Sequence, residues 1–272
     1  MLPVGSTRRA FTLIELLTVI AIIGVLGAIL IPTVGSCREH ARKSREVSAA
    51  RQLMIAYHLA ADENRGRLLP FQEQANTSVT GEGGRTITGI TAKRWPHRIR
   101  PYLGDRFQAT LYVNAQSDYY SDTAFDDDYT LSLRPTFGMN GSFVGGDDSP
   151  SNTLTVPPVR RLTEAALPAG LIVFASAHDR TAGPNAGNWR ISSPISGFPV
   201  GAPNWPAEDI AGRPPTPGQD RDFGYVAFRW GGRAVTAFLD GHVALHTCAE
   251  LRDMRLWSDA ARRENNPAYL PH

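Results

Sequence analysis

The sequence predicts an α+β fold in which a long N-terminal α-helix packs on a C-terminal antiparallel β-sheet head with long loops. Three observations support this prediction. Residues 11–31 form an apolar run, residues 33–62 continue in a helix-compatible pattern, and short apolar runs separated by turn residues follow. We therefore expect one helix over 11–62 and a globular, β-rich head over 63–272.

Composition limits the class of protein. The chain has 272 residues and is 42% apolar, which suits one globular domain and an appendage. Its 28 basic and 26 acidic residues leave a net charge of +2, so we expect no nucleic-acid partner. Many of the 25 Gly and 20 Pro follow residue 140 and predict a head rich in turns.

The two cysteines, Cys37 and Cys248, are far apart in the sequence and form no C-x-x-C pair. Neither a zinc ribbon nor a disulfide framework is therefore indicated. Two unrelated small apolar residues are the favoured interpretation, and a single disulfide formed after export is the alternative.

The apolar run 11–31 has the length of a membrane-spanning helix. At about 1.5 Å per residue it spans roughly 31 Å, which matches one bilayer core. A cleaved secretory signal has a shorter apolar run, so we expect this helix to be retained. Its one ionisable group is Glu15, and a carboxylate in hydrocarbon costs on the order of 2 to 3 kcal/mol unless it finds a partner. Pro32 ends the run and predicts a bend.

Residues 8–16, RRAFTLIEL, resemble the prepilin peptidase recognition site of type IV pilins and type II secretion pseudopilins. The resemblance implies cleavage between Ala10 and Phe11, methylation of the new Phe11 amine, and a fifth mature residue that is acidic, here Glu15. Ala10 stands where the family usually has Gly. Pro32 matches the proline that the family commonly carries at the end of the apolar stretch.

The resemblance also implies a pilin-like fold and a function. The chain would be a structural, non-enzymatic subunit of a type II secretion or type IV pilus-like system, with a leader at 1–10 and a transmembrane segment at 11–31. The Glu15 carboxylate would pair with the Phe11 amine of a neighbouring subunit during filament assembly. The implied partners are prepilin peptidase, other pseudopilin subunits in a homo- or hetero-oligomeric filament, an inner-membrane assembly platform and the membrane.

Charge counting favours the opposite orientation to the one that the resemblance implies. The leader has two basic residues, whereas four follow the apolar run: Arg38, Arg42, Lys43 and Arg45. Prepilin leaders are read on the cytoplasmic face, so we expect a single-pass protein of the inner membrane with its head in the periplasm, or in an extracellular filament. The interspersed Glu39 and Glu46 predict a solvated helix surface.

The second part of the helix has one apolar stripe that could dock on a head. Apolar residues recur there at spacings of three and four: Val47, Ala50, Met54, Tyr57 and Ala61. The whole helix would be roughly 78 Å long. Asn64-Arg65-Gly66 predicts its end, because Asn and Gly readily adopt the left-handed capping conformation.

Seven short segments of the head are candidate strands: 86–90, 109–113, 129–133, 171–175, 225–228, 234–239 and 243–246. The last three predict an antiparallel meander. Gly231-Gly232 would form its first turn, and Asp240-Gly241 a second, two-residue turn.

Residues 228–243 carry a second resemblance. FRWGGRAVTAFLDGHV is similar to the His-x9-Asp-Gly-His signature of prepilin-like proteins abundant in planctomycetes and verrucomicrobia, here with Asp240, Gly241 and His242. Trp230 replaces the first His, so the signature implies no paired-histidine metal site. Three further segments resemble the same group: 94–104, 135–143 and 255–261.

Motifs for hydrolysis or phosphate binding are weak. The sequence has no G-x-S-x-G elbow, and the glycine-rich 81–84 lacks the flanking strand, helix and third glycine of a phosphate-binding loop. His242 and His246 would share one strand face, and His178-Asp179 could join them around zinc, but ordinary packing is the favoured interpretation.

Calcium is the one cofactor with some support, since major secretion pseudopilins can bind it in a head loop. Two acidic clusters could supply oxygen ligands: Asp126, Asp127 and Asp128, and Asp147 and Asp148. A solvated acidic loop is the alternative, and no other cofactor is expected.

Residues 179–222 are rich in Pro and Gly and predict a long, partner-facing surface loop. This loop leaves a second function open. The head could be a cell-surface binding or polysaccharide-directed module that a pilin-type anchor displays.

Overall fold

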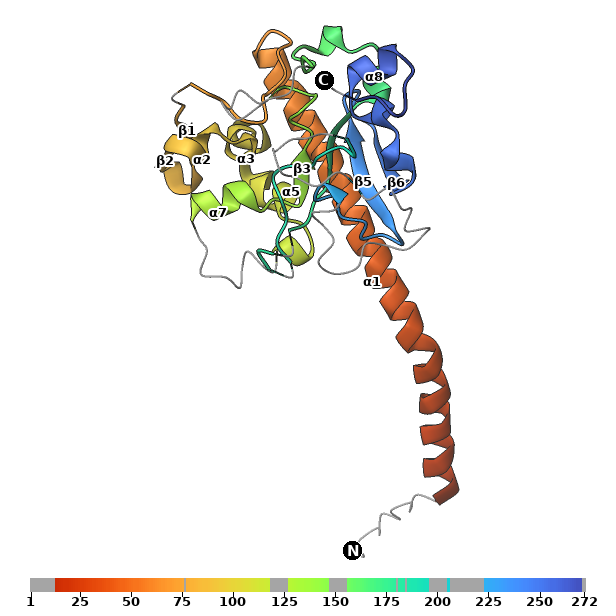
Figure 1. Cartoon of the computed structure of the whole chain (residues 1–272). Coiled ribbons are helices and arrows are strands. Elements are labelled where there is room, and N and C mark those ends of the chain that lie inside the picture. The colour runs from red at the N-terminus through yellow and green to blue at the C-terminus, as the bar shows by residue number, and fades with distance from the viewer. Residues whose placement is uncertain are drawn as a thin grey trace, which may run out of the picture. The chain divides into compact units, whose positions relative to one another are not determined.

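The structure is a computed structural model that shows an α+β, pilin-like fold, as the sequence predicts (Figure 1). A long N-terminal helix, α1 (Leu13–Glu63), precedes an antiparallel sheet with long connections. The chain divides into two compact units, Met1–Ser44 and Arg45–His272. The described residues are 13–75, 77–117, 127–146, 156–179, 181–183, 185–195, 205 and 223–270, without the side chains of 29–32 and 82.

The main sheet has four antiparallel strands in the order β3-β4-β5-β6. They are β3 (Phe137–Met139), β4 (Ile172–Ser176), β5 (Arg233–Phe238) and β6 (Val243–Thr247). A small sheet pairs β1 (Val79–Thr80) with β2 (Thr86–Ile87).

Short helices lie between the strands and after β6. Among the described residues, the α-helices that follow α1 are α2 (Gly89–Lys93), α3 (Trp95–Arg98), α4 (Arg100–Leu103), α5 (Phe107–Leu111), α7 (Asp128–Leu133) and α8 (Asp259–Arg263). The 3₁₀ turns are Glu82–Gly84, Gly104–Arg106, Leu162–Glu164, Pro168–Gly170, Glu250–Arg252 and Met254–Leu256.

The predicted apolar stripe of α1 is confirmed as the part that packs on the sheet. Ala50, Met54, Tyr57 and Ala61 are at most 1% exposed, and Val47 is half-buried against the same core. Four more residues widen this face: Ala49, Leu53, Ala56 and Ala60. Many are alanines, which let the helix approach the sheet closely.

The end of α1 is also confirmed. The Gly66 N–H donates to the Ala61 carbonyl (2.8 Å), and the Arg65 N–H donates to the Asp62 carbonyl (3.2 Å), the two bonds of a Schellman cap. Arg65 itself takes the left-handed conformation (φ 56°), which a glycine usually occupies.

Three of the candidate strands are wrong. Residues 109–111 and 129–133 belong to α5 and α7, and 225–228 forms only an isolated bridge. Phe107 and Leu111 are buried four residues apart, which is a helical spacing. Asp127 caps α7, since its carboxylate accepts the Thr130 N–H at 2.5 Å. The segments 171–175, 234–239 and 243–246 correspond to β4, β5 and β6, whereas only the start of 86–90 is a strand, and β3 was not predicted.

The predicted meander is confirmed only in its last two strands. The segment 225–228 continues along β4 instead of pairing with β5: the Ala227 N–H donates to the Ser176 carbonyl (2.8 Å), and the His178 N–H donates to the Tyr225 carbonyl (2.9 Å). The Gly231-Gly232 turn does form, because Trp230 and Arg233 exchange backbone hydrogen bonds of 3.0 and 3.1 Å.

The described part of 179–222 is not a surface loop. Trp189, Ile191 and Trp205 are at most 7% exposed, and Trp189 stacks on Phe71 with ring centroids 4.1 Å apart. These large apolar residues anchor a Pro- and Gly-rich segment to the core. The other residues of this range lie outside the described part of the chain.

Glu46 of α1, which was predicted to lie on a solvated helix surface, is fully buried. Its Oε1 accepts hydrogen bonds from the Arg229 guanidinium (3.1 Å) and from the Ser176 hydroxyl. Oε2 is buried with no partner among the described residues. The helix, β4 and the segment before β5 therefore meet at one buried carboxylate.

Replacing Glu46 tests this junction. Glu46→Ala leaves Arg229 without its carboxylate, and we expect the free energy of unfolding to fall by about 3 kcal/mol. Glu46→Gln keeps an acceptor for Ser176 and should cost less. Urea denaturation of the full chain in detergent, followed by tryptophan fluorescence, measures both. Equal stability of Glu46→Ala and the wild type would contradict the assignment.

The buried ring of His97 indicates that the stability of the head depends on pH. Its Nε2–H donates to the Asp128 carbonyl at 2.7 Å, and its buried Nδ1 has no partner among the described residues. Burial lowers the pKa of His97, so the folded head favours the neutral ring. This contribution is complete above the ordinary pKa of about 6.5 and is lost as the pH falls through the lower folded pKa.

The expected result is a lower Tm at pH 5 than at pH 7. His97→Gln keeps an N–H for the carbonyl but cannot titrate, so its Tm should depend less on pH. Thermal unfolding at both pH values gives the comparison, and an unchanged pH slope in His97→Gln would rule out this role.

Candidate functional site

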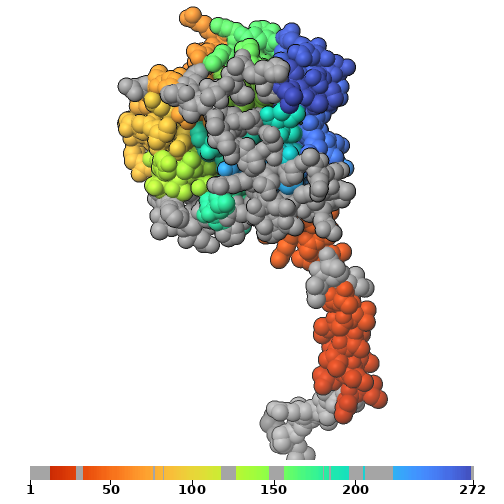
Figure 2. All heavy atoms as spheres, viewed as in Figure 1, coloured from red at the N-terminus to blue at the C-terminus, as the bar shows by residue number. Residues whose placement is uncertain are grey.

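The first part of α1 is an apolar surface that its own unit leaves uncovered. Leu13, Ile14 and Ile23 are 82%, 73% and 62% exposed, and none of the apolar window that could cross a membrane is buried. Figure 2 shows the described side chains of this stretch at the surface (red). Such a continuous apolar surface marks a contact with lipid or with another protein.

Glu15 lies in the first turn of α1 among these exposed apolar side chains. The Thr18 hydroxyl donates to the Glu15 carbonyl at 3.0 Å, within the helical turn. A carboxylate is favourable near a helix N-terminus, because the unpaired N–H groups there carry partial positive charge. Glu15 is therefore compatible with the helix and accessible from outside it.

The structure describes only part of the other predicted processing and assembly residues. Ala10 and Phe11 lie outside the described residues. α1 continues as one helix through Pro32, whose side chain also lies outside them, and the predicted bend stays a prediction.

A second exposed apolar pair lies on the part of α1 that belongs to the head. Ile55 and Leu59 are 60% and 49% exposed, four residues apart, on the face of the helix away from the core. Their spacing of four residues is also the spacing of the buried stripe, so the sequence alone does not show that they lie on the exposed face.

The Asp-Gly-His signature forms the turn between β5 and β6, with one residue more than predicted. The Gly241 N–H donates to the Phe238 carbonyl (2.8 Å), and the Phe238 N–H donates to the His242 carbonyl (3.0 Å), which closes a three-residue loop with a glycine bulge. The Asp240 carboxylate accepts the His242 N–H (3.0 Å) and contacts the imidazole Nδ1 (2.6 Å). Burial alone would raise the pKa of Asp240, but these hydrogen bonds hold it below its usual value.

This turn docks on α1. His58 of the helix contacts the Leu239 carbonyl through Nε2 at 2.8 Å, and a Cβ on Gly241 would lie 3.3 Å from the His58 ring. Gly241 also has φ +94°, which disfavours any side chain. The His242 ring stacks on Phe238 with centroids 4.2 Å apart. These contacts give the signature a structural role, in which it fixes the hairpin to the helix.

The residues proposed as alternative zinc ligands have other contacts. The His246 Nδ1 contacts the Thr236 hydroxyl (2.7 Å), and Asp179 pairs with Arg134 (2.7 Å). Within the described ranges, no group of three His, Cys, Asp or Glu side chains is placed to hold a metal ion. Both cysteines are free thiols, and Trp230 packs partly buried against the main core.

The calcium candidates divide between described and undescribed residues. Asp127 caps α7, and Asp128 pairs with Arg85 at 2.5 Å, so both carboxylates are used within the head. As arranged, these two do not form a cation site. Asp126, Asp147 and Asp148 lie outside the described residues, and calcium binding there stays a prediction.

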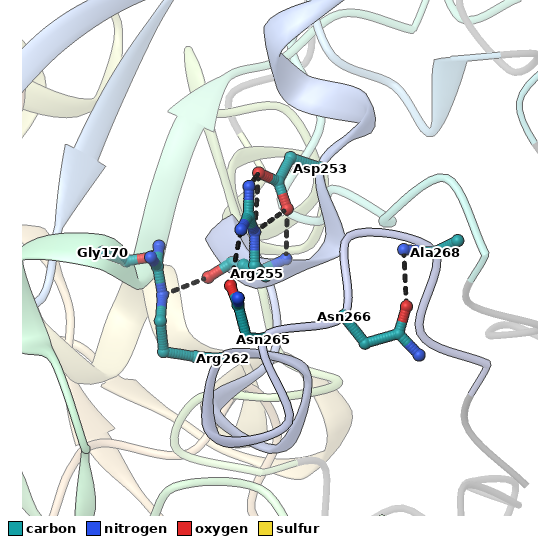
Figure 3. A network of polar contacts seen from close by, with 7 residues as sticks. All are labelled: Gly170, Asp253, Arg255, Arg262, Asn265, Asn266 and Ala268. Carbon is teal, nitrogen blue, oxygen red and sulfur yellow. Dashed lines mark hydrogen bonds and ion pairs between the residues drawn. The ribbon is translucent and has the colours of Figure 1, made fainter.

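The C-terminal segment that includes 255–261 is held by arginines (Figure 3). Arg255 pairs with Asp253 (2.6 Å) and donates to the Asn265 side chain (2.7 Å). Arg262 donates to the Gly170 carbonyl just before β4 (3.3 Å). This network attaches the C-terminal segment to the turn that precedes β4.

A surface pocket of about 560 Å³ lies on the described part of the head. Its lining includes Arg100, Asp105, Phe107 and Gln108, next to the glycine-rich turn around Gly83. The Arg100 guanidinium lies over the Phe107 ring, 4.5 Å from its centroid.

Gly241→Ala tests the docked turn. The added Cβ is disfavoured by the positive φ and contacts His58, so we expect the free energy of unfolding to fall by about 1 to 2 kcal/mol. Gly35→Ala is the matched control, because its Cβ would meet nothing within 4 Å in α1. Urea denaturation compares them, and a neutral Gly241→Ala would refute the docking role.

Comparison with known proteins finds a family match in the N-terminal segment. Residues 5–31 match the family described as the prokaryotic N-terminal methylation motif. No curated protein and no solved structure matches the chain. The match indicates a pilin- or pseudopilin-type precursor in general, with processing and assembly among pilin subunits. Together with the single apolar helix, it fits a membrane-anchored protein. Residues 5–31 thus carry a methylation motif consistent with a prepilin-like protein.

Proposed function

We propose that this chain is a structural pseudopilin or pilin-like subunit of a type II secretion or type IV pilus-like system. Prepilin peptidase cleaves it between Ala10 and Phe11, the Phe11 amine is methylated, and an inner-membrane assembly platform adds the subunit to a filament. The head lies in the periplasm and has no catalytic task.

The observation that carries this proposal is the methylation motif at 5–31, followed by a helix whose apolar surface is exposed from Leu13 onward. A soluble enzyme has no use for such a helix. In a filament subunit, such a helix inserts in the bilayer before assembly and packs against the same helix of other copies afterwards.

Glu15 supplies the specificity of this assembly. Cleavage creates a charged amine at Phe11, four positions before the carboxylate. When helices pack side by side with a stagger, the carboxylate of one subunit pairs with the amine of the next, and both lose the penalty of an unpaired charge in an apolar medium. Packing without this register does not bring the two charges together.

The head adds a second contact along the same helix. Ile55 and Leu59 project from the exposed face of α1, and burying each would contribute about 1.5 to 3 kcal/mol at most. They supply an apolar surface for a neighbouring subunit beyond the membrane-spanning segment.

The alternative function is a binding head directed at extracellular polysaccharide. The pocket lined by Arg100 and Asp105 favours it, because polar side chains beside an aromatic ring, here Phe107, suit a sugar. A filament subunit with such a head would keep the same processing.

The processing claim has a direct test. Protein isolated from its native cells should begin at Phe11, and its N-terminal peptide should carry one added methyl group by mass spectrometry. Glu15→Gln should be cleaved as the wild type is but should be lost from sheared filament fractions, whereas Glu15→Asp should retain part of the assembly.

Two results would contradict the proposal. Mature protein that keeps residues 1–10 would exclude peptidase processing. Normal filament yield from Glu15→Gln, with the head folded, would remove the carboxylate from the assembly mechanism.

A further inference from the structure

A basic face follows the apolar part of α1. Arg38 and Arg42 are one helical turn apart, so they lie on the same side of the helix, and both are exposed. Lys43 is half-buried beside them, and Glu39 is the nearest acidic residue. This stretch of the first unit therefore has more positive than negative charge.

The depth of this face follows from helix geometry. Val34 is the last exposed large apolar residue of α1 before the basic face, three residues past the apolar run 11–31. Arg38 lies four residues beyond Val34, or about 6 Å along the axis, and Arg42 lies about 12 Å beyond it. The headgroup layer outside the hydrocarbon core is about 5 to 8 Å thick on each side. Arginine side chains can also reach back along the helix toward the interface. Both guanidinium groups can therefore reach the level of the lipid phosphates.

We propose that Arg38 and Arg42, assisted by Lys43, bind the phosphate groups of anionic phospholipids in the leaflet on the head side of the membrane. Guanidinium groups bind phosphate through paired, charge-assisted hydrogen bonds. The proposal rests on the membrane insertion of α1 in the proposed function, but not on cleavage or methylation.

This contact accounts for the reversed charge balance of the two flanks. Basic residues on the head side oppose the usual orientation rule, so they need a purpose on that side. Anionic headgroups held at Arg38 and Arg42 fix the depth of the helix until the subunit leaves the bilayer. An acidic surface on a neighbouring subunit is the competing partner, but the position next to the apolar span favours lipid.

The test uses the full chain with Arg8→Gln and Arg9→Gln in every sample, so that leader charges do not contribute. The protein is reconstituted in phosphatidylcholine vesicles with trace spin-labelled phosphatidylglycerol or phosphatidylcholine. The motionally restricted fraction of each label gives the selectivity for the anionic lipid. Arg38→Gln/Arg42→Gln/Lys43→Gln removes the basic face. Arg51→Gln/Arg106→Gln/Arg233→Gln removes the same charge from exposed head residues and serves as the control.

We expect the parent to prefer phosphatidylglycerol by about fivefold or more at low salt, less at high salt, and the control to keep this preference. The basic-face variant should show nearly equal association of both lipids. No preference in the parent, or an unchanged preference in the basic-face variant, would overturn the proposal. Loss of filaments in that variant without any change in lipid preference would assign the face to a protein partner instead.

These outcomes are separate from those of the proposed function. A chain that is not cleaved before Phe11 would refute the processing claim and leave the lipid measurement valid. A cleaved and assembling chain without lipid preference would refute only the lipid claim.

Discussion

The apolar first part of α1, which its own unit leaves uncovered, is the constraint on which the rest of the molecule depends. Its exposed large side chains run from Leu13 to Leu26, and each would gain about 1.5 to 3 kcal/mol from burial. Summed over the segment, this reaches the roughly 5 to 15 kcal/mol that stabilises a whole domain. Another medium is needed to cover it, and in our proposal this is first a bilayer and then the same helix of other subunits. A subunit that moves from one to the other keeps its apolar side chains out of water throughout.

In the head, by contrast, the inner face of the same helix is buried. There the small residues of its inner face, such as Ala50 and Ala61, let it lie directly on the sheet, and the signature turn at Gly241 fits against its His58. Glu46 shows what a buried carboxylate requires, because Arg229 and Ser176 of the head both bind it. The proposed partner of Glu15 has the same kind of role but comes from another subunit. One helix thus carries one charge compensated within the chain and, in our proposal, one compensated by assembly.

Local patterns predicted part of this structure. The stripe from Val47 to Ala61, the Schellman end at Gly66 and the β5-β6 hairpin follow from periodicity and turn chemistry, which act over a few residues. The segments 109–113 and 129–133 were wrongly predicted to be strands, since short apolar runs occur in both strands and helices. In 129–133 the Asp127 cap favours the helix. The burial of Glu46, Trp189 and Trp205 depends on residues far away in the sequence, so no local pattern could reveal it. At the candidate site, the sequence predicted the methylation motif that the family match supports, and the role of Glu15 stays a prediction. The exposure of Ile55 and Leu59 was evident only once the buried face was known.

The most direct test of the central claim is to locate the Glu15 carboxylate in assembled protein. Filaments grown from a mixture of ¹⁴N- and ¹⁵N-labelled subunits can be treated with dicyclohexylcarbodiimide, an apolar reagent that joins a carboxylate to a nearby amine. Our account predicts an amide between Glu15 of one subunit and the Phe11 amine of another, seen by mass spectrometry as peptide pairs of mixed isotope. Filaments in which Glu15 forms no such bond, or bonds only within its own chain, would contradict it.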